Sequence, residues 1–140
     1  MAKTAKSIAL VTGGTSGIGK AICADLLDRG YQVVTVARHA PERPRKGITH
    51  YTADLADSAA AGAIGREIAK HHAISHFVHN AGRSIGGSLA DSRTADFDYS
   101  YRLHVQAAVA LHRHLPPPLC TEVRPLLYRV RLGQIQANLD

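Results

Sequence analysis

The stretch Ala9-Leu10-Val11-Thr12-Gly13-Gly14-Thr15-Ser16-Gly17-Ile18-Gly19-Lys20 decides the fold of this chain. It starts in a short apolar run, passes through glycines and hydroxyl residues, and enters an apolar helical pattern over 18–29 that ends at Gly30. The order strand, tight loop, helix brings backbone N–H groups and a helix N-terminus to a place where a phosphate can bind. Glycines in the loop also let an anion approach the main chain closely. The stretch therefore predicts a phosphate-binding loop.

Two other phosphate-loop patterns match this stretch only in part. The form G-x-x-x-x-G-K-[ST], used by nucleotide hydrolases, fits as far as Lys20, but Ala21 follows where Mg²⁺ needs a hydroxyl. The fingerprint G-x-G-x-x-G lacks its third glycine, because Ile22 stands there. The pattern T-G-x-x-x-G-x-G fits throughout, from Thr12 to Gly19.

The composition indicates one globular domain. The chain has 140 residues, 45% hydrophobic content and a formal net charge of +6. Its basic residues are scattered and its aromatic residues few, which does not favour a nucleic-acid surface. No apolar run is long enough for a membrane span or a signal peptide. Cys23 and Cys120 do not suggest a disulfide framework, so the expected location is a reducing cytoplasm.

The hydrophobic pattern predicts an open parallel sheet with helices on both faces. Apolar runs at 8–11, 31–37, 48–52 and 74–78 are the predicted strands. They alternate with helical patterns, which is typical of an α/β fold built from βαβ units.

Two further helices are predicted, one from an N-cap at Asp57 to about His72 and one over 94–115. Gly62 and Gly65 are expected to weaken the first. Its predicted face comprises Ala60, Ala63, Ile64, Glu67 and Ile68. The predicted stripe of the long helix comprises Phe97, Tyr101, Val105, Ala108 and Val109, with Leu111 and Leu115 alongside.

The residues after the second strand predict the choice of cofactor. An acidic residue there would hydrogen-bond a ribose diol and repel a 2′-phosphate. The chain instead reads Ala37-Arg38-His39, and the planar guanidinium of Arg38 suits a phosphate. The alternative interpretation is a solvated loop arginine.

Three motifs together resemble the short-chain dehydrogenase/reductase family, in particular its 3-oxoacyl reductase-like members. They are the glycine loop, Asp54-Leu55 after the third strand, and His79-Asn80-Ala81-Gly82 after the fourth, which is similar to N-N-A-G of the family. The resemblance implies a Rossmann-type doubly wound sheet that binds NADP(H), with NAD(H) as the second choice. The implied cofactor-binding residues are Gly13, Thr15, Ser16, Gly17, Ile18, Gly19, Arg38, Asp54, Leu55, Asn80, Ala81 and Gly82.

The resemblance also implies an activity and an assembly. The activity is hydride transfer between an alcohol and a ketone or 3-oxo ester. In the family, an Asn on the long helix helps to order a proton-relay water, and His104 stands at that position here. The long helix often packs between subunits in the family, so a homo-oligomer through residues 94–115 is expected.

The resemblance covers residues 1–115 as the cofactor-binding half of a reductase domain, and the Pro/Leu/Arg-rich tail 116–140 does not match it. The catalytic Ser and the Tyr-x-x-x-Lys that follow in the family are absent; Tyr128, for example, is followed by Leu132. We expect a sheet truncated after its fourth strand and the following helix. Two interpretations stay open: a truncated or frame-shifted reductase, or a non-catalytic dinucleotide-binding module.

The nine histidines do not predict a metal site. His72, His76 and His79 pass from a helix into a strand, and His112 and His114 point two ways on a helix. No Cys or carboxylate completes either set, so no metal is expected.

Overall fold

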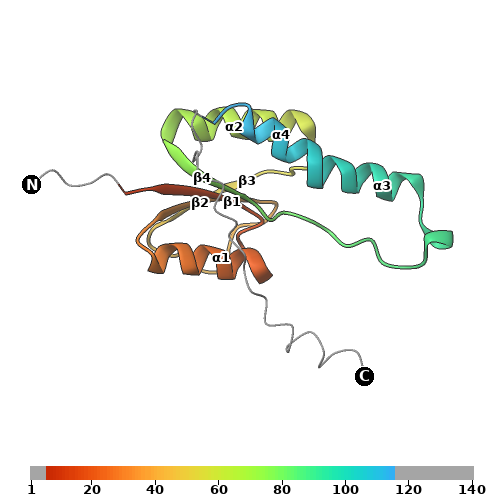
Figure 1. Cartoon of the computed structure of the whole chain (residues 1–140), viewed down its shortest axis with the longest axis horizontal. Coiled ribbons are helices and arrows are strands. Elements are labelled where there is room, and N and C mark those ends of the chain that lie inside the picture. Colours follow the sequence, from red (N-terminus) through yellow and green to blue (C-terminus); the bar gives the residue numbers. More distant parts are fainter. Residues whose placement is uncertain (1–5, 116–140) are drawn as a thin grey trace, which may run out of the picture.

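A four-stranded sheet of order β3-β2-β1-β4 forms the middle layer of the computed structural model, which describes residues 6–115 (Figure 1). The strands are β1 (Ile8–Thr12), β2 (Gln32–Ala37), β3 (Ile48–Thr52) and β4 (Ile74–His79). Every neighbouring pair is parallel. This confirms the predicted doubly wound order, in which β1 lies centrally and the chain crosses to β4 on its other side. The tail 116–140, with Cys120 and Tyr128, lies outside the described residues.

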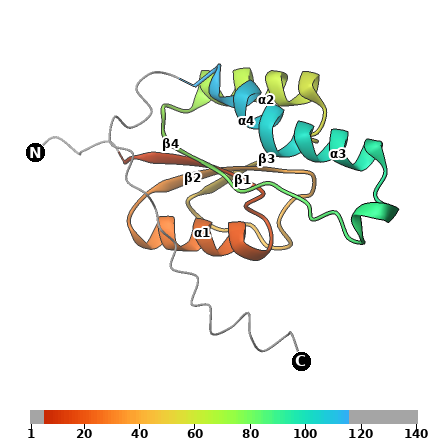
Figure 2. The ribbon, with the colours of Figure 1, turned by 45° about the vertical axis from the view of Figure 1, so that its right-hand side comes forward.

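Helices cover both faces of the sheet, as the sequence predicted. Helix α1 (Gly17–Asp28) packs on one face, and α2 (Ser58–His71) lies on the other beside a long helix (Figures 1 and 2). The long helix comprises α3 (Thr94–Tyr101), η2 (Arg102–Gln106) and α4 (Ala107–His112). A short 3-10 turn, η1 (Leu89–Asp91), lies in the loop before it. No helix within residues 6–115 is long and apolar enough to cross a membrane.

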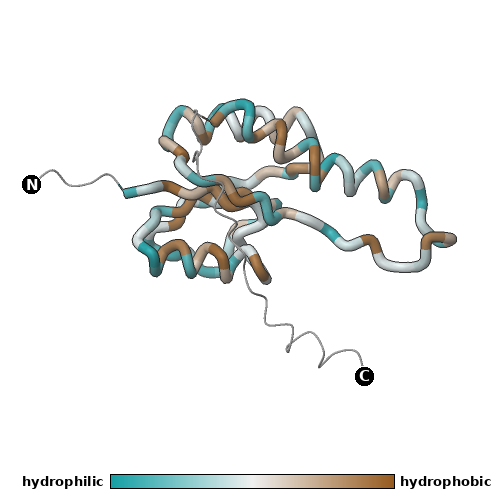
Figure 3. Tube along the Cα trace, in the orientation of Figure 1, coloured by the Kyte–Doolittle hydropathy of each residue, from teal (hydrophilic) through white to brown (hydrophobic). Residues whose placement is uncertain are grey.

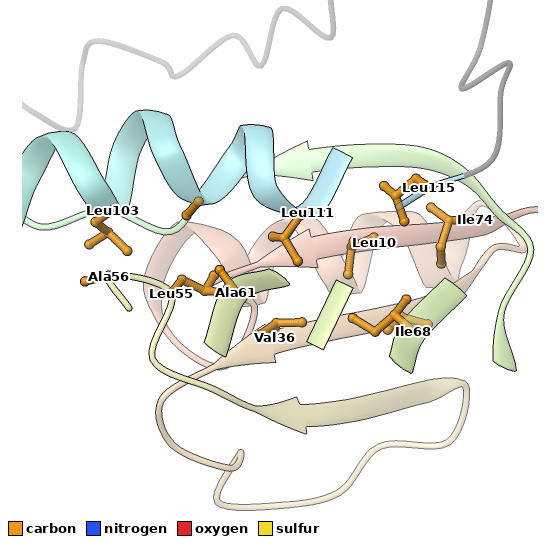
Figure 4. Close-up of a cluster of buried hydrophobic side chains, with 12 residues drawn as sticks. Leu10, Val36, Leu55, Ala56, Ala61, Ile68, Ile74, Leu103, Leu111 and Leu115 are labelled. Atoms are coloured by element: carbon orange, nitrogen blue, oxygen red, sulfur yellow. The ribbon is translucent and has the colours of Figure 1, made fainter. Parts of the chain in front are cut away.

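Each face of the sheet has its own hydrophobic core. On the α1 face, Val11 and Val33 pack with Leu26 of α1. The opposite core is larger and joins the sheet to α2 and the long helix (Figure 4). The hydropathy tube shows the apolar segments gathered along the central strands (Figure 3). Because β1 and β2 are buried on both sides, their sequences are continuous apolar runs rather than alternating ones.

The long helix differs from the prediction in its regularity and in its buried face. The predicted uniform α-helix to Leu115 ends at His112, and its middle turn is a π-helix over Arg102–Gln106. The side chains that enter the core are Leu103, Ala107 and Leu111. The main residues of the predicted stripe face outward instead, since Phe97, Tyr101, Val105 and Val109 are 45–56% exposed. Leu111 and Leu115, which were predicted to lie alongside that stripe, are buried in the core. The helical period was predicted correctly, but periodicity alone did not identify which of two apolar stripes meets the sheet.

Helix α2 begins as predicted, and its buried face only partly matches the prediction: Ile68 is buried and Ile64 packs against the core, but Ala63 is exposed. The Asp57 carboxylate accepts N–H bonds from Ala59 at 2.8 Å and Ala60 at 3.2 Å, which confirms it as the N-cap. The buried residues of the helix are Ala61, Gly65 and Ile68. A Cβ on Gly65 would lie 3.4 Å from the Leu111 Cα, so this glycine lets α2 and α4 approach closely. Its contribution to packing was missing from the sequence analysis, which counted only its low helix propensity.

Candidate cofactor-binding site

The carboxyl ends of β1, β2 and β4 border an open cleft of about 480 Å³. This volume is within the usual range of small-molecule sites. The cleft is lined by most of the predicted cofactor residues, namely Gly13, Thr15, Ser16, Gly17, Ile18, Arg38, Asp54, Leu55, Asn80, Ala81 and Gly82. Five residues that were not predicted to bind the cofactor also line it, namely Ala37, His39, Ala53, Arg83 and Leu103. A second pocket, of about 250 Å³, is lined by residues that include Gln32, Gly47 and His72.

The N-terminus of α1 opens into the cleft. Ser16 is its N-cap residue, but the Ser16 side chain makes no capping hydrogen bond. Gly17 has a φ of +50°, and a Cβ built on it would meet no atom within 4 Å. The first N–H groups of a helix have no partner within the helix and carry partial positive charge. This corner of the cleft is therefore suited to an anion.

Gly19 is the predicted site residue that does not line the cleft. It is buried, and a Cβ built on it would overlap the Gly13 carbonyl oxygen and lie 2.5 Å from Asn80 Nδ2. Gly19 thus lets the start of α1 pack against the loop after β1. The structure thus shows a packing reason for glycine at this position, and a contact of Gly19 with a phosphate stays a prediction.

The end of β2 carries two basic side chains. Arg38 and His39 are exposed and line the cleft directly after Ala37. Arg38 forms no ion pair with any residue of the described range 6–115. Its guanidinium is therefore available for a ligand.

Asp54 and Leu55, which follow β3, also line the cleft. Asp54 Oδ1 accepts a hydrogen bond from the Ala56 N–H at 3.0 Å, which fixes the turn into α2. Leu55 is only 3% exposed and belongs to the large core. The cleft is therefore bordered at this point by the edge of a side chain that belongs to the core.

The wall formed by residues 80–82 is held from beneath by Thr12. The Thr12 hydroxyl is buried at the end of β1 and accepts the N–H groups of Asn80 and Ala81, each at 3.0 Å. Asn80 Nδ2 donates to the Gly13 carbonyl oxygen at 3.3 Å. These bonds connect the end of β4 with the loop after β1, so both walls of the cleft are fixed to each other.

His104 packs against this wall from the long helix. A Cβ on Gly82 would lie 2.5 Å from His104 Cε1, so only glycine fits beneath the ring. His104 Nε2 lies 3.3 Å from both the N–H and the carbonyl oxygen of Arg83. The tautomer of His104 decides which of the two bonds it makes. The guanidinium of Arg83 in turn lies over the Tyr99 ring, 5.6 Å from its centroid.

The sequence analysis missed a role for His79, the last residue of β4. Its Nδ1 lies 2.9 Å from the Thr12 hydroxyl and its Nε2 lies 3.1 Å from the Leu103 carbonyl oxygen. Burial lowers the pKa of His79 below its ordinary value, against the raising effect of the bond to Leu103. The available signal was the departure from the family pattern N-N-A-G, because His79 stands in place of its first Asn. Within residues 6–115, no group of three His, Cys, Asp or Glu side chains is placed to hold a metal ion.

The sheet order and the cleft at the carboxyl ends of the strands define a fold of the Rossmann type. A family model described as short chain dehydrogenase matches residues 7–124. The chain belongs to the short-chain dehydrogenase family.

The chain is similar to several known proteins. It is 38% identical over 130 residues to a chloroplastic divinyl chlorophyllide a 8-vinyl-reductase of Oryza sativa, covering 84% of this chain and 31% of that protein. A short chain dehydrogenase family protein of Francisella tularensis is 25% identical, with a TM-score of 0.71 over 79% of this chain and 45% of that one. ElxO with NADP bound is 25% identical, with a TM-score of 0.66 over 78% of this chain and 48% of that one. The chain thus spans less than half the length of these relatives.

Proposed function

We propose that this chain binds NADP(H) in the cleft and forms the cofactor-binding part of a short-chain oxidoreductase. The observation that carries the proposal is the end of β2, where Arg38 lines the cleft and no carboxylate follows the strand. A carboxylate at this place selects a free ribose diol, whereas a nearby arginine accommodates a 2′-phosphate. NAD(H) is the weaker ligand in this proposal.

The residues of the cleft fit the parts of such a dinucleotide. The N-terminus of α1, with Ser16 and Gly17, suits the pyrophosphate, because it offers N–H groups, a hydroxyl and space. The family resemblance further implies that Asp54 and Leu55 border the adenine and that the wall formed by residues 80–82 borders the nicotinamide ribose; all of these residues line the cleft. When bound, the cofactor supplies the hydride, while the protein binds and orients it.

The proposed reaction is hydride transfer between an alcohol and a ketone or 3-oxo ester. It rests on the resemblance of the motifs to 3-oxoacyl reductase-like members of the family. We place it in the cytoplasm, where the buried free thiol of Cys23 would stay reduced.

A non-catalytic dinucleotide-binding module is the second candidate. The 140 residues of the chain contain no Tyr-x-x-x-Lys, whose Tyr is the proton donor in the family. A positioned proton donor accelerates such reactions about 10²–10⁴-fold. Binding of NADP⁺ without oxidation of NADPH by a panel of ketones and 3-oxo esters would favour the module, and turnover would favour the enzyme.

The proposal is tested by calorimetric titration of the chain with NADP⁺ and NAD⁺. A charge-assisted hydrogen bond contributes about 1.5–3 kcal/mol. Arg38→Ala should therefore weaken NADP⁺ binding roughly tenfold to a hundredfold and leave NAD⁺ binding nearly unchanged. Arg43→Ala is the matched control, because Arg43 is exposed in the same loop and does not line the cleft. If Arg38→Ala weakens NADP⁺ and NAD⁺ binding equally, or if Arg43→Ala weakens NADP⁺ binding as much as Arg38→Ala does, the assignment of Arg38 to the 2′-phosphate is wrong.

A further inference from the structure

His79 lies between the two elements that frame the inner end of the cleft. It ends β4, directly before the wall formed by residues 80–82, and its ring reaches the π-helical turn η2. One ring nitrogen contacts the Thr12 hydroxyl and the other contacts the carbonyl oxygen of Leu103. Each contact belongs to a different neighbour, so the ring bridges β1 and η2.

The partners of the ring determine its protonation state. A carbonyl oxygen can only accept, so the 3.1 Å contact to Leu103 requires a proton on His79 Nε2. The Thr12 hydroxyl already accepts two backbone N–H groups, from Asn80 and Ala81. Its single proton is therefore free to be donated to His79 Nδ1, which lies at 2.9 Å. All groups are satisfied only when His79 is neutral and carries its proton on Nε2.

Protonation of His79 would disturb this arrangement at Thr12. Nδ1 would become a donor, and the hydroxyl oxygen would face three donors with two lone pairs. One of the N–H groups of Asn80 and Ala81 would then lose its acceptor. These N–H groups belong to the cleft wall, so a change at His79 acts directly on the proposed cofactor site.

We propose that neutral His79 is a positioning residue, which holds the wall formed by residues 80–82 against β1 and the π-helical turn against β4, and that its protonation weakens dinucleotide binding. The binding part of this inference rests on the proposed function. The bridging part does not, because it concerns contacts within the chain itself.

The surroundings of His79 support a neutral ring. Burial is the main effect that lowers its pKa, and the charge of His104 on η2 acts in the same direction. The β1 partner, Thr12, carries no charge, and neither does the Phe77 ring of β4, 6.1 Å from the imidazole. Within the described residues, His104 is the titratable side chain whose charge acts on His79.

The bridge is tested on the free chain by NMR with ¹⁵N-labelled histidine. At pH 7.5 His79 should be neutral with its proton on Nε2. As the pH falls below 6.5, the amide signals of Asn80, Ala81 and Leu103 should move together with the His79 ring, at one apparent pKa. A proton on Nδ1, or amides that do not follow the ring, would overturn the bridge. If His79 stays neutral until the chain unfolds, the inference that its protonation weakens dinucleotide binding is wrong.

The effect on binding is tested by titrating NADP⁺ against the parent chain and His79→Asn at several pH values. Asparagine offers an acceptor and a donor but does not titrate. Parent affinity should fall about tenfold per pH unit below the pKa of His79 measured by NMR. Protonation of the 2′-phosphate acts on both proteins, so the difference between them isolates His79.

A matched control and a separate readout complete the test. His112→Asn changes an exposed histidine of α4 and should keep the parental pH profile. Identical pH profiles of parent and His79→Asn would overturn the inference. If no dinucleotide binds at any pH, the proposed function fails, while the amide titrations of the free chain still decide whether His79 forms the bridge.

Discussion

At the residue scale, two glycines in the first turn of α1 have opposite surroundings. Gly17 faces open space at a φ of +50°, whereas Gly19 is buried against the Gly13 carbonyl and Asn80. A side chain at Gly17 would enter the cleft. A side chain at Gly19 would force the loop and α1 apart.

Gly17→Asn and Gly19→Ala should therefore separate binding from stability. Asparagine tolerates the left-handed conformation, so Gly17→Asn should abolish NADP⁺ binding with little change in the free energy of unfolding. Gly19→Ala should lower the free energy of unfolding by about 1–3 kcal/mol, as overpacking does. Urea unfolding and calorimetric titration measure the two effects. The account fails at this point if Gly19→Ala is as stable as the parent, or if Gly17→Asn binds as well.

The residues that sequence reasoning placed well are those whose role is local. The glycine loop, Asp57 as an N-cap and Arg38 after β2 follow from short patterns, and the structure puts all three where they were expected. The packing of Gly19 against Asn80 and the contacts of His79 were not predicted, because both depend on partners far along the chain. The ring of His79, for instance, contacts Thr12 and Leu103, which are 67 and 24 positions away.

At the scale of elements, helices α1 and α2 begin differently, although each has a polar residue at its N-cap. Asp57 satisfies two N–H groups of α2, whereas Ser16 leaves the N-terminus of α1 without a side-chain cap. A helix start without its cap costs stability unless a ligand takes the place of the cap. We therefore expect Asp57 to stabilise the fold and propose that Ser16 contributes to ligand binding.

Asp57→Ala and Ser16→Ala should accordingly have reciprocal effects. Asp57→Ala should lower the free energy of unfolding by about 1 kcal/mol and leave NADP⁺ affinity unchanged. Ser16→Ala should hardly change the free energy of unfolding, but it should weaken NADP⁺ binding roughly tenfold to a hundredfold, as the loss of one hydrogen bond to a charged group does. Thermal unfolding with and without NADP⁺ reports both. A Ser16→Ala chain that is destabilised as much as Asp57→Ala would show that Ser16 is an ordinary cap.

The long helix shows where periodicity is insufficient. Its sequence contains two apolar stripes, one through Leu103, Ala107 and Leu111 and one through Tyr101, Val105 and Val109. Both have helical spacing, and only the tertiary structure shows that the first enters the core. The π-helical turn was not predictable either, because it depends on how the helix passes over β4.

At the scale of the whole molecule, the outward stripe supplies four of the six exposed large hydrophobic side chains of residues 6–115. Phe97, Tyr101, Val105 and Val109 follow one another along the helix and are each 45–56% exposed. Exposed apolar patches of this kind mark contact surfaces. We expect the chain to associate through this stripe, as the family resemblance implies for the long helix.

Tyr101→Glu should shift this association toward monomer, because a carboxylate in an apolar contact loses its water. The expected dissociation constant rises roughly tenfold or more, measured by sedimentation velocity over a range of concentrations. Leu89→Glu is the control, since Leu89 is 82% exposed in η1, away from the stripe. A parent chain that stays monomeric, or equal effects of both variants, would contradict a contact through the stripe.

The most direct test of the central claim is to titrate the ¹⁵N-labelled chain with NADP⁺ and follow every assigned amide. The claim is that the dinucleotide occupies the cleft at the carboxyl ends of β1, β2 and β4. The account predicts the largest shifts at 13–18, at Arg38 and at 80–82, with little change at Gln32 and Gly47 around the second pocket. Saturable binding that shifts Gln32 and Gly47 but leaves 13–18 and Arg38 unmoved would contradict it.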